Sequence, residues 1–349
     1  MERKPEEKAL RKLQQVQGAG NLYSYSQLTM FRDCNFRWYG SYALGFKDSV
    51  NFHTAYGTLF HAVASRAVEA QVAGTLPGDA AGVEPWIAAA RDRYGAVQAL
   101  VPADAEESLA TMALAAAAAM PTDAESVQTE SVLLQPLPAA RGQTPGPLDL
   151  THLEADLLRE GDKDAYFRVL NALEAAGANA LQVRPDATIF VPGAVRLRDW
   201  KTNAKNPRKH LDDLIGTYTP QVQLYAAVGR RRWQERQVQG DLHFLEYGTP
   251  ASVGVSKEDL DATARGAVEL MGAIAHGAGR GPDGFAKAVG DACHYCHLAK
   301  MKRDGQPVCP EGAEYRKAKG WDRYDEQDAL FRIRAGIEWT GDDDYRACA

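Results

Sequence analysis

The hydrophobic pattern of the chain changes character near residue 181. Before this point, apolar residues recur at helical spacing or in Ala-rich runs. This pattern predicts helices over about 26–40, 54–74 and 109–120. The remainder of residues 75–180 alternates further Ala-rich pieces with breaks rich in proline and glycine, such as LPGDAAGVEP. We therefore expect a mostly helical segment over residues 75–180.

Short segments rich in β-branched and aromatic residues follow residue 180 and predict strands. They read ALQV at 180–183, ATIFV at 187–191 and AVRLRDW at 194–200. Further expected elements are a helix over 212–236, a strand over 238–248 and a helix over 256–279. Strands and helices mixed in this way predict an α/β fold.

Composition places the chain among ordinary globular proteins. It has 349 residues, 45% of them hydrophobic and 25% charged, with a formal net charge of −6. This mild acidity excludes a wholly basic nucleic-acid coat protein but permits a local basic groove. The charged N-terminus has no signal-peptide pattern and no run is long enough to span a bilayer, so we expect a cytoplasmic protein with reduced cysteines and no membrane partner.

Two of the predicted strands form a hairpin that carries unusual charges. Pro192–Gly193 supplies the turn between residues 187–191 and 194–200, and the hairpin brings Asp186 near Asp199, although the sequence does not fix the register. Alternation along the second strand places Val195, Leu197, Asp199 and Lys201 on one face. A face that begins apolar and ends with a carboxylate and an ammonium is costly to bury unless these charges are used.

Neighbouring carboxylates at Asp186 and Asp199 would repel each other unless a cation lay between them. Hard oxygen ligands favour Mg²⁺ or Mn²⁺, which can polarise a phosphate and lower the pKa of a bound water. Lys201 could orient that water and offset developing negative charge. The alternative is a surface hairpin whose Asp–Lys ion pair contributes little.

At these residues the sequence resembles the PD-(D/E)xK nucleases, and specifically their RecB-like branch, which includes the AddB nuclease domain, exonuclease V and CRISPR-associated nucleases. The signature is PD at 185–186 followed by DWK at 199–201. Further motifs match in family order: GTLFH, with Gly57 and His61, QVQLY, with Gln221 and Tyr225, and one early cysteine with a late cysteine cluster. The resemblance implies a restriction-endonuclease-like core, a central mixed sheet flanked by helices, over residues 21–310, between a charged lead-in at 1–20 and a tail at 311–349.

The resemblance also implies roles for individual residues. His61, Asp186, Asp199 and the backbone carbonyl of Trp200 would bind the metal, and Lys201 would be the catalytic lysine. Gln221 and Tyr225 would position the DNA strand and the lysine. By themselves, these residues could equally be a core or capping histidine and one face of an amphipathic helix. Glu154 and Asp156 are rival carboxylates for the position of Asp186.

The cysteines suggest a second metal centre. Cys293 and Cys296 form a C-x-x-C motif, with Cys309 downstream and Cys34 far upstream, whereas Cys348 has no obvious partner. Four thiolates suit Zn²⁺ or an iron–sulfur cluster, and His294 and His297 leave a mixed Cys/His zinc site open. The resemblance implies that Cys34, Cys293, Cys296 and Cys309 bind a structural [4Fe–4S] cluster, although the gap between Cys296 and Cys309 is longer than usual.

Two basic runs, 201–210 and 229–236, the second with Trp233, would suit single-stranded nucleic acid.

The resemblance implies a metal-dependent exonuclease that acts on single-stranded DNA or DNA ends in repair, recombination or defence. The alternative is a nuclease-like DNA-binding subunit of a larger helicase–nuclease or CRISPR-type complex, with little activity alone. The chain has no ATP-binding loop motif, so a partner helicase would be a separate chain.

Overall fold

A computed structural model of the chain describes most of its residues. The described ranges are 5–46, 52–95, 100–138, 148–157, 163–202, 211–245, 248–303 and 305–321. None of the helices in these ranges is long and apolar enough to cross a membrane.

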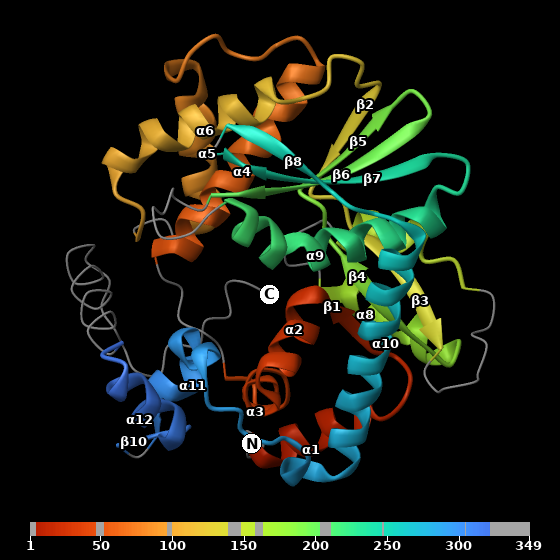
Figure 1. Ribbon diagram of the computed structural model, residues 1–349, viewed down its shortest axis with the longest axis vertical. Coiled ribbons are helices and arrows are strands. Elements are labelled where there is room, and N and C mark those ends of the chain that lie inside the picture. The colour runs from red at the N-terminus through yellow and green to blue at the C-terminus, as the bar shows by residue number, and fades with distance from the viewer. Residues whose placement is uncertain are drawn as a thin grey trace.

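A five-stranded mixed sheet lies at the centre of the fold (Figure 1). Its order is β2 (Ser126–Thr129), β5 (Ala187–Val191), β6 (Ala194–Lys201), β7 (Gln237–Phe244) and β8 (Thr249–Val253). The central pair β6–β7 is parallel, and the other pairs are antiparallel. This is the mixed α/β arrangement that the resemblance implied.

A second sheet of three strands has the order β1 (Leu22–Ser24), β4 (Ala178–Val183) and β3 (Leu133–Pro138). The short strands β9 (Lys302–Arg303) and β10 (Gln306–Pro307) form a separate hairpin. Strands β2 and β3 lie in the region expected to be mostly helical. Their partners lie far along the chain, in β5 and β4, so local periodicity gave little sign of them.

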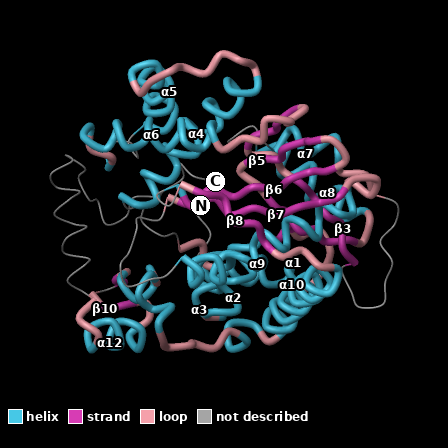
Figure 2. The backbone as a smooth tube through the Cα atoms, turned by 45° about the horizontal axis from the view of Figure 1, so that its top comes forward, coloured by secondary structure: helices cyan, strands magenta, loops and turns pink. Residues whose placement is uncertain are grey.

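Helices cover both faces of the five-stranded sheet (Figure 2). On one side lie α4 (Phe52–Val72), α5 (Glu84–Tyr94) and α6 (Glu106–Ala118). On the other side lie α9 (Leu211–Arg232), α10 (Lys257–Gly279), α2 (Tyr25–Asp33), α3 (Asn35–Trp38) and α1 (Pro5–Val16). The remaining helices are α7 (Thr151–Leu157), α8 (Lys163–Ala175), α11 (His297–Lys300) and α12 (Pro310–Ala318), with a π-helical turn at Tyr39–Ala43.

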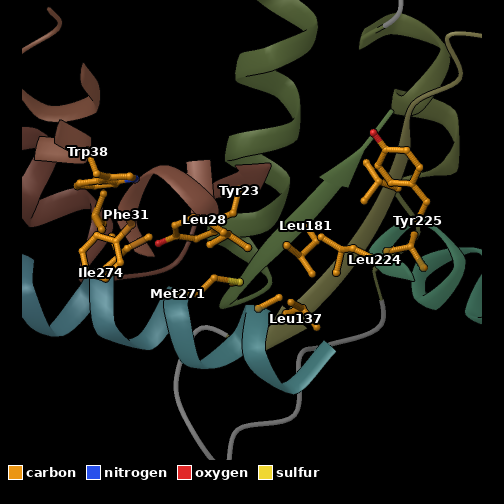
Figure 3. Close-up of a cluster of buried hydrophobic side chains, with 14 of the residues drawn as sticks. Tyr23, Leu28, Phe31, Trp38, Leu137, Leu181, Leu224, Tyr225, Met271 and Ile274 are labelled. Carbon is orange, nitrogen blue, oxygen red and sulfur yellow. The ribbon is translucent and has the colours of Figure 1, made fainter. Parts of the chain in front are cut away.

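Strand β6 is buried on both faces, because its alternate side chains enter two different cores. Val195 and Leu197 join the cluster beneath α9, part of which is drawn in Figure 3. Ala194 and Trp200 join the cluster beneath α4 and α6. Burial on both faces holds the charged end of β6 inside the protein.

The first helices are built into the core. Ala9, Leu13 and Val16 of α1 are buried in the same cluster as β6, so the charged lead-in carries an apolar stripe on one side. Ser24 caps α2 through a capping box with Gln27. The helix expected over 26–40 is interrupted, because Cys34 adopts an extended backbone (φ −162°, ψ 110°) between α2 and α3.

A group of buried polar side chains lies between β6 and β7, on the sheet face toward α6. Arg198 donates to Asp241 Oδ2 at 3.1 Å and to the carbonyl of Ala119, just past the end of α6, at 2.9 Å. His243 is 1% exposed, and neither of its ring nitrogens has a hydrogen-bond partner among the described residues. Burial, followed by the charge of Arg198, lowers the pKa of His243 to about 4.

We expect His243 to make the protein less stable in weak acid. Its ordinary pKa of about 6.5 exceeds the folded value, so the unfolded chain binds the proton more readily. The stabilisation is complete above about pH 6.5 and is lost as the pH falls toward 4, with a loss of about 2 kcal/mol by pH 5. Urea denaturation of the wild type and His243→Leu at pH 7.5 and pH 5 measures this contribution.

The comparison between the two proteins separates His243 from other titrating groups. Asp199 has a raised folded pKa of about 6, so it makes the fold more stable, not less, as the pH falls. This effect is present in both proteins and cancels when their free energies of unfolding are compared. Equal losses of stability between the two pH values in the wild type and His243→Leu would show that His243 is protonated in the fold.

Candidate active site and cysteine site

The hairpin of β5 and β6 places the two aspartates opposite each other. Its antiparallel register pairs Ala187 with Arg198, so the next position along the hairpin sets Asp186 against Asp199. Pro192–Gly193 forms the turn, and Gly193 has a positive φ of 72°, which glycine adopts without strain. The hairpin, its turn and the approach of the two aspartates confirm the sequence prediction.

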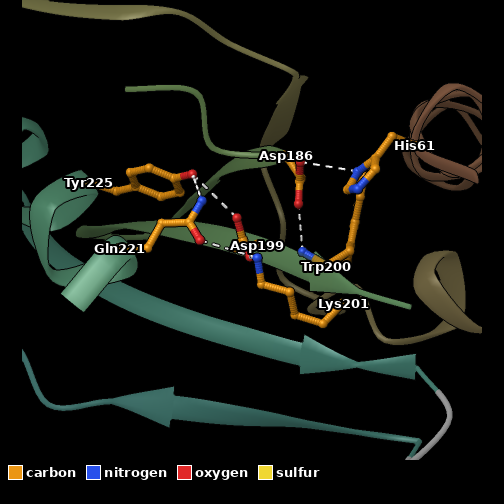
Figure 4. A network of polar contacts seen from close by, with 7 residues as sticks. All are labelled: His61, Asp186, Asp199, Trp200, Lys201, Gln221 and Tyr225. Carbon is orange, nitrogen blue, oxygen red and sulfur yellow. Dashed lines mark hydrogen bonds and ion pairs between the residues drawn. The ribbon is translucent and has the colours of Figure 1, made fainter. Parts of the chain in front are cut away.

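Helix α9 brings two polar side chains onto the same face of β6 (Figure 4). Lys201 Nζ lies 2.5 Å from Asp199 Oδ2 and 3.2 Å from Gln221 Oε1. Gln221 Nε2 donates to the Tyr225 hydroxyl at 2.5 Å, and that hydroxyl lies 3.3 Å from Asp199 Oδ1. Gln221 and Tyr225 are four residues apart and therefore share one side of the helix.

Asp186 connects the hairpin to helix α4 (Figure 4). Its Oδ2 accepts a hydrogen bond from the backbone N–H of Trp200 at 2.6 Å, and its Oδ1 lies 3.1 Å from His61 Nδ1. His61 stacks at an angle on the Trp200 ring, with centroids 6.3 Å apart. The PD/DWK signature, GTLFH and QVQLY therefore meet at one place, although 164 positions separate His61 from Tyr225 in the chain.

Burial and mutual repulsion control the charges of this site. Burial and the charge of Asp186 raise the pKa of Asp199 to about 6, although Lys201 and His61 oppose this shift. Burial lowers the pKa of Lys201, but the nearby Asp199 outweighs it, and the net pKa is raised. The same balance between burial and Asp186 raises the pKa of His61. The site thus holds two carboxylates against two cationic groups.

The donor set suits a hard divalent cation. Asp199 Oδ2 and His61 Nδ1 are buried atoms, and they lie within ion-pair distance of Lys201 Nζ and Asp186 Oδ1, respectively. Two carboxylates and an imidazole are ligands that Mg²⁺ or Mn²⁺ accepts. In the described ranges, no three histidine, cysteine, aspartate or glutamate side chains converge closely enough to bind one ion. Each carboxylate is instead neutralised by His61 or Lys201.

Two residues beside the site were missed by the sequence reasoning. The ring of Tyr218, on α9, lies 4.2 Å from Lys201 Nζ in a cation–π contact. Glu130 has a positive φ of 50°, donates its N–H to the carbonyl of Asp186 at 2.9 Å, and contributes to the raised pKa of His61. A strained non-glycine backbone is a mark of functional sites, but no sequence pattern signals it. Tyr218 was detectable, because it lies three residues before Gln221 on the same helix.

Glu154 is engaged elsewhere. Its Oε1 accepts the backbone N–H of Leu134 at 2.9 Å, and its Oε2 pairs with Arg232 at 3.0 Å. These contacts tie α7 to β3 and to the far end of α9. The side chain of Asp156 lies outside the described part of the structure.

The four candidate cysteines lie together although Cys34 is 259 positions from Cys293 in the chain. One pocket is lined by Cys34, Cys293, Cys296 and Cys309, and all four are buried and free. Neither neighbouring histidine lines this pocket: His294 packs against Trp321, and His297 Nε2 lies 3.4 Å from Ser41 Oγ. Cys348 lies outside the described residues. The geometry thus gathers four sulfurs and no imidazole.

Burial and nearby polar groups act in opposite directions on the charge of the cysteine sulfurs, and burial has the larger effect. Burial raises the pKa of Cys296 and of Cys309, but backbone N–H groups and the nearby cations Arg37 and Lys287 oppose the shift. The N–H of Ala288 donates to Cys34 Sγ at 3.5 Å. Such N–H···S contacts are also common around cluster-bound thiolates.

Close packing shapes the pocket walls. A Cβ on Gly312 would lie 3.2 Å from Cys309 Sγ and 3.6 Å from Cys293 Sγ, so glycine leaves room between these sulfurs. Arg316, on α12, is 3% exposed and donates to the carbonyls of Cys293 and His294. This buried guanidinium fixes the C-x-x-C segment. Sequence reasoning missed it because its partners are backbone atoms.

The basic run at 229–236 does not lie at the active site. Arg232 is eleven residues beyond Gln221 on α9, about 16 Å along the helix axis. Arg232 pairs with Glu154, and Trp233 packs edge-on against Phe190. The other basic run falls mostly within residues 203–210, outside the described part of the chain.

Comparison with known families gives the same assignment. The sequence matches the family described as the PD-(D/E)XK nuclease superfamily over residues 23–301. This range holds every candidate active-site residue together with Cys34, Cys293 and Cys296. No curated protein matches the chain. Because the match covers well over half of the sequence, and the signature carboxylates and lysine lie together on one hairpin, the chain belongs to the PD-(D/E)XK nuclease superfamily.

Proposed function

We propose that the protein is a metal-dependent deoxyribonuclease, specifically an exonuclease of the RecB-like branch that acts on single-stranded DNA or on DNA ends. The observation that carries this proposal is the convergence of Asp186, Asp199 and Lys201 with His61. A buried carboxylate pair bounded by a lysine has a high energetic cost, and phosphodiester hydrolysis is a use for it. The pathway would be repair, recombination or defence.

Each residue of the site has a role in this proposal. Asp186, Asp199, His61 and the Trp200 carbonyl would hold Mg²⁺ or Mn²⁺, which supplies Lewis acidity and lowers the pKa of a bound water. Lys201 would orient the attacking water and offset negative charge on the phosphate. Gln221 accepts from Lys201 and donates to Tyr225, and this pair would position the lysine and the DNA strand.

The four cysteines would bind a [4Fe–4S] cluster as a structural element. Supporting this are four buried sulfurs in one pocket without a histidine, and the glycine that leaves space between two of them. The cluster would join the start of the domain, at Cys34, to the segment 293–309, which is too short and loop-rich to build a core alone.

We expect the cysteines to be needed for iron and for stability together. Anaerobically purified wild type should be brown and contain about four iron atoms per chain. Cys296→Ser should lose both the colour and a large part of the thermal stability, because the free energy of cluster binding contributes directly to the free energy of folding. Colourless wild-type protein that contains stoichiometric zinc would instead assign the site to Zn²⁺.

Digestion of end-labelled DNA tests the nuclease proposal. Linear single-stranded DNA in Mg²⁺ or Mn²⁺ should be degraded progressively from an end, and circular single strands of the same sequence should persist. Cleavage of circles would exclude an exonuclease. Binding without cleavage of any substrate, in protein with full iron content, would support the nuclease-like subunit of a larger complex instead.

A further inference from the structure

An exposed group of aromatic rings lies beside the cysteine pocket. Tyr295 lies within the C-x-x-C segment. Its side chain is 70% exposed, more than any other large hydrophobic side chain that the structure describes. The His294 ring lies between Tyr295 and Trp321, with centroid distances of 4.3 and 4.6 Å. Tyr315 extends the group, 5.8 Å from Trp321. Four rings from two segments thus form one surface, which we call the aromatic platform.

Positive charge predominates in the segment that carries the aromatic platform, although the Tyr315 hydroxyl also donates to Asp291 at 3.3 Å. Lys319 Nζ lies 5.5 Å from the Tyr315 ring, and Arg37 donates to the Tyr295 carbonyl at 3.3 Å. Residues 287–321 contain seven lysines and arginines against four acidic residues, whereas the whole chain has a net charge of −6. The basic side chains Lys302, Arg303, Lys317 and Lys319 are all exposed. This segment is therefore a local basic region on an acidic protein.

The position of Tyr295 is not explained by packing. A tyrosine that stabilises the fold normally buries its ring, as Tyr225 does at 4% exposure. The backbone at Tyr295 is already fixed by the neighbouring cysteines and by Arg316. An exposed ring with positive charge around it is the arrangement with which proteins bind single strands, by base stacking and phosphate attraction.

We propose that the aromatic platform binds single-stranded DNA, with Tyr295 stacking on a base and Lys319 contacting a phosphate. The proposal rests on the proposed nuclease function for the identity of the ligand, but it concerns a site separate from the hairpin of Asp186 and Asp199. The platform would hold a strand outside the active site and would replace the basic run 229–236 as the place where aromatic and basic groups meet.

Fluorescence anisotropy of a labelled oligothymidylate, measured in EDTA so that no cleavage occurs, tests the platform. Tyr295→Ala should weaken binding about tenfold, since one base–aromatic stack is lost. Tyr295→Phe keeps the ring and should bind within about twofold of the wild type. Lys319→Ala should reduce the slope of log K against log salt by about 0.7, because one phosphate contact is lost.

Phe167→Ala is the matched control, because Phe167 is an aromatic residue on α8 with 56% exposure and should leave binding unchanged. Iron content is measured for each variant. If Tyr295→Ala loses iron, Lys319→Ala, whose residue lies outside the segment 293–309, decides the question. Wild-type affinity and salt slope in Lys319→Ala, or equal weakening by Phe167→Ala, would overturn the proposal.

Hydrolysis of bis(p-nitrophenyl) phosphate separates this site from the active site. The small diester needs no strand contacts, so Tyr295→Ala should hydrolyse it at the wild-type rate. Absence of this activity in the wild type would count against the nuclease function while leaving the EDTA binding result intact. A selective loss of diester hydrolysis in Tyr295→Ala, with oligothymidylate binding preserved, would overturn the platform.

Discussion

Asp199→Asn is expected to lower the rate of Mg²⁺-dependent DNA cleavage by about three orders of magnitude or more and to leave the protein folded. Asp199 is 3% exposed, and its carboxylate lies between the Lys201 ammonium and the Tyr225 hydroxyl. Asparagine has nearly the same shape and can still contact the hydroxyl, but it carries no negative charge. Cleavage of end-labelled DNA and the far-UV circular dichroism spectrum measure the two outcomes.

Lys201→Met should also abolish cleavage, because the lysine that would orient the water is lost while both carboxylates remain. The response to Mg²⁺ distinguishes this variant from Asp199→Asn. The ammonium lies 2.5 Å from Asp199 Oδ2 and competes with a cation for that carboxylate. Its removal leaves Asp186 and Asp199 with less compensating charge, so Mg²⁺ should raise the melting temperature more than in the wild type. In Asp199→Asn the same addition of Mg²⁺ should have little effect.

Lys257→Met is the control for the loss of a positive charge, since Lys257 is exposed at the start of α10 and belongs to neither proposed site. It should cleave DNA and respond to Mg²⁺ as the wild type does. Full cleavage by both Asp199→Asn and Lys201→Met would refute the assignment of the active site. A response to Mg²⁺ that is smaller in Lys201→Met than in the wild type would show that the lysine does not compete with the metal.

The local chemistry of the hairpin was predictable from the sequence, and its environment was not. Alternation along β6 correctly placed Leu197, Asp199 and Lys201 on one face, where a Cβ on Gly229 of α9 would meet Leu197 and where Gln221 meets Lys201. The period of two follows from backbone geometry alone. The partners of the opposite face of β6 were not predicted, because they belong to α4, α6 and β7. Contacts between distant segments leave no local periodicity.

The start of the domain shows the same limit. Aromatic and apolar spacing over 26–40 predicted one helix, but the chain is extended at Cys34 and turns into a π-helical segment at Tyr39–Ala43. The break sets Cys34 in the pocket with Cys293, Cys296 and Cys309. Helix propensity was outweighed here by contacts with residues more than 250 positions away. The break at Cys34 could therefore not be read from the hydrophobic pattern.

The second large effect is expected at the buried pair of Arg198 and Asp241, where Arg198→Met should cost about 3–5 kcal/mol of folding free energy. Both side chains are less than a tenth exposed, and burial lowers the pKa of Arg198 while Asp241 opposes the shift. The substitution leaves Asp241 buried without its cation and removes the donor to the Ala119 carbonyl. Urea denaturation at pH 7.5 measures the loss.

The double variant Arg198→Met/Asp241→Leu should recover most of that stability, since neither residue is then charged and both are apolar and of similar volume. Arg196→Met, two positions earlier on the same face of β6 and only half-buried, is the control and should cost less than about 1 kcal/mol.

If the double variant is stable but cleaves DNA slowly, the pair serves to hold β6 and β7 in register beneath Asp199, because Arg198 and Asp241 are opposite each other in the parallel ladder. If Arg198→Met alone is as stable as Arg196→Met, the pair makes no net contribution to the fold, and the charge on Asp241 must be satisfied by another group.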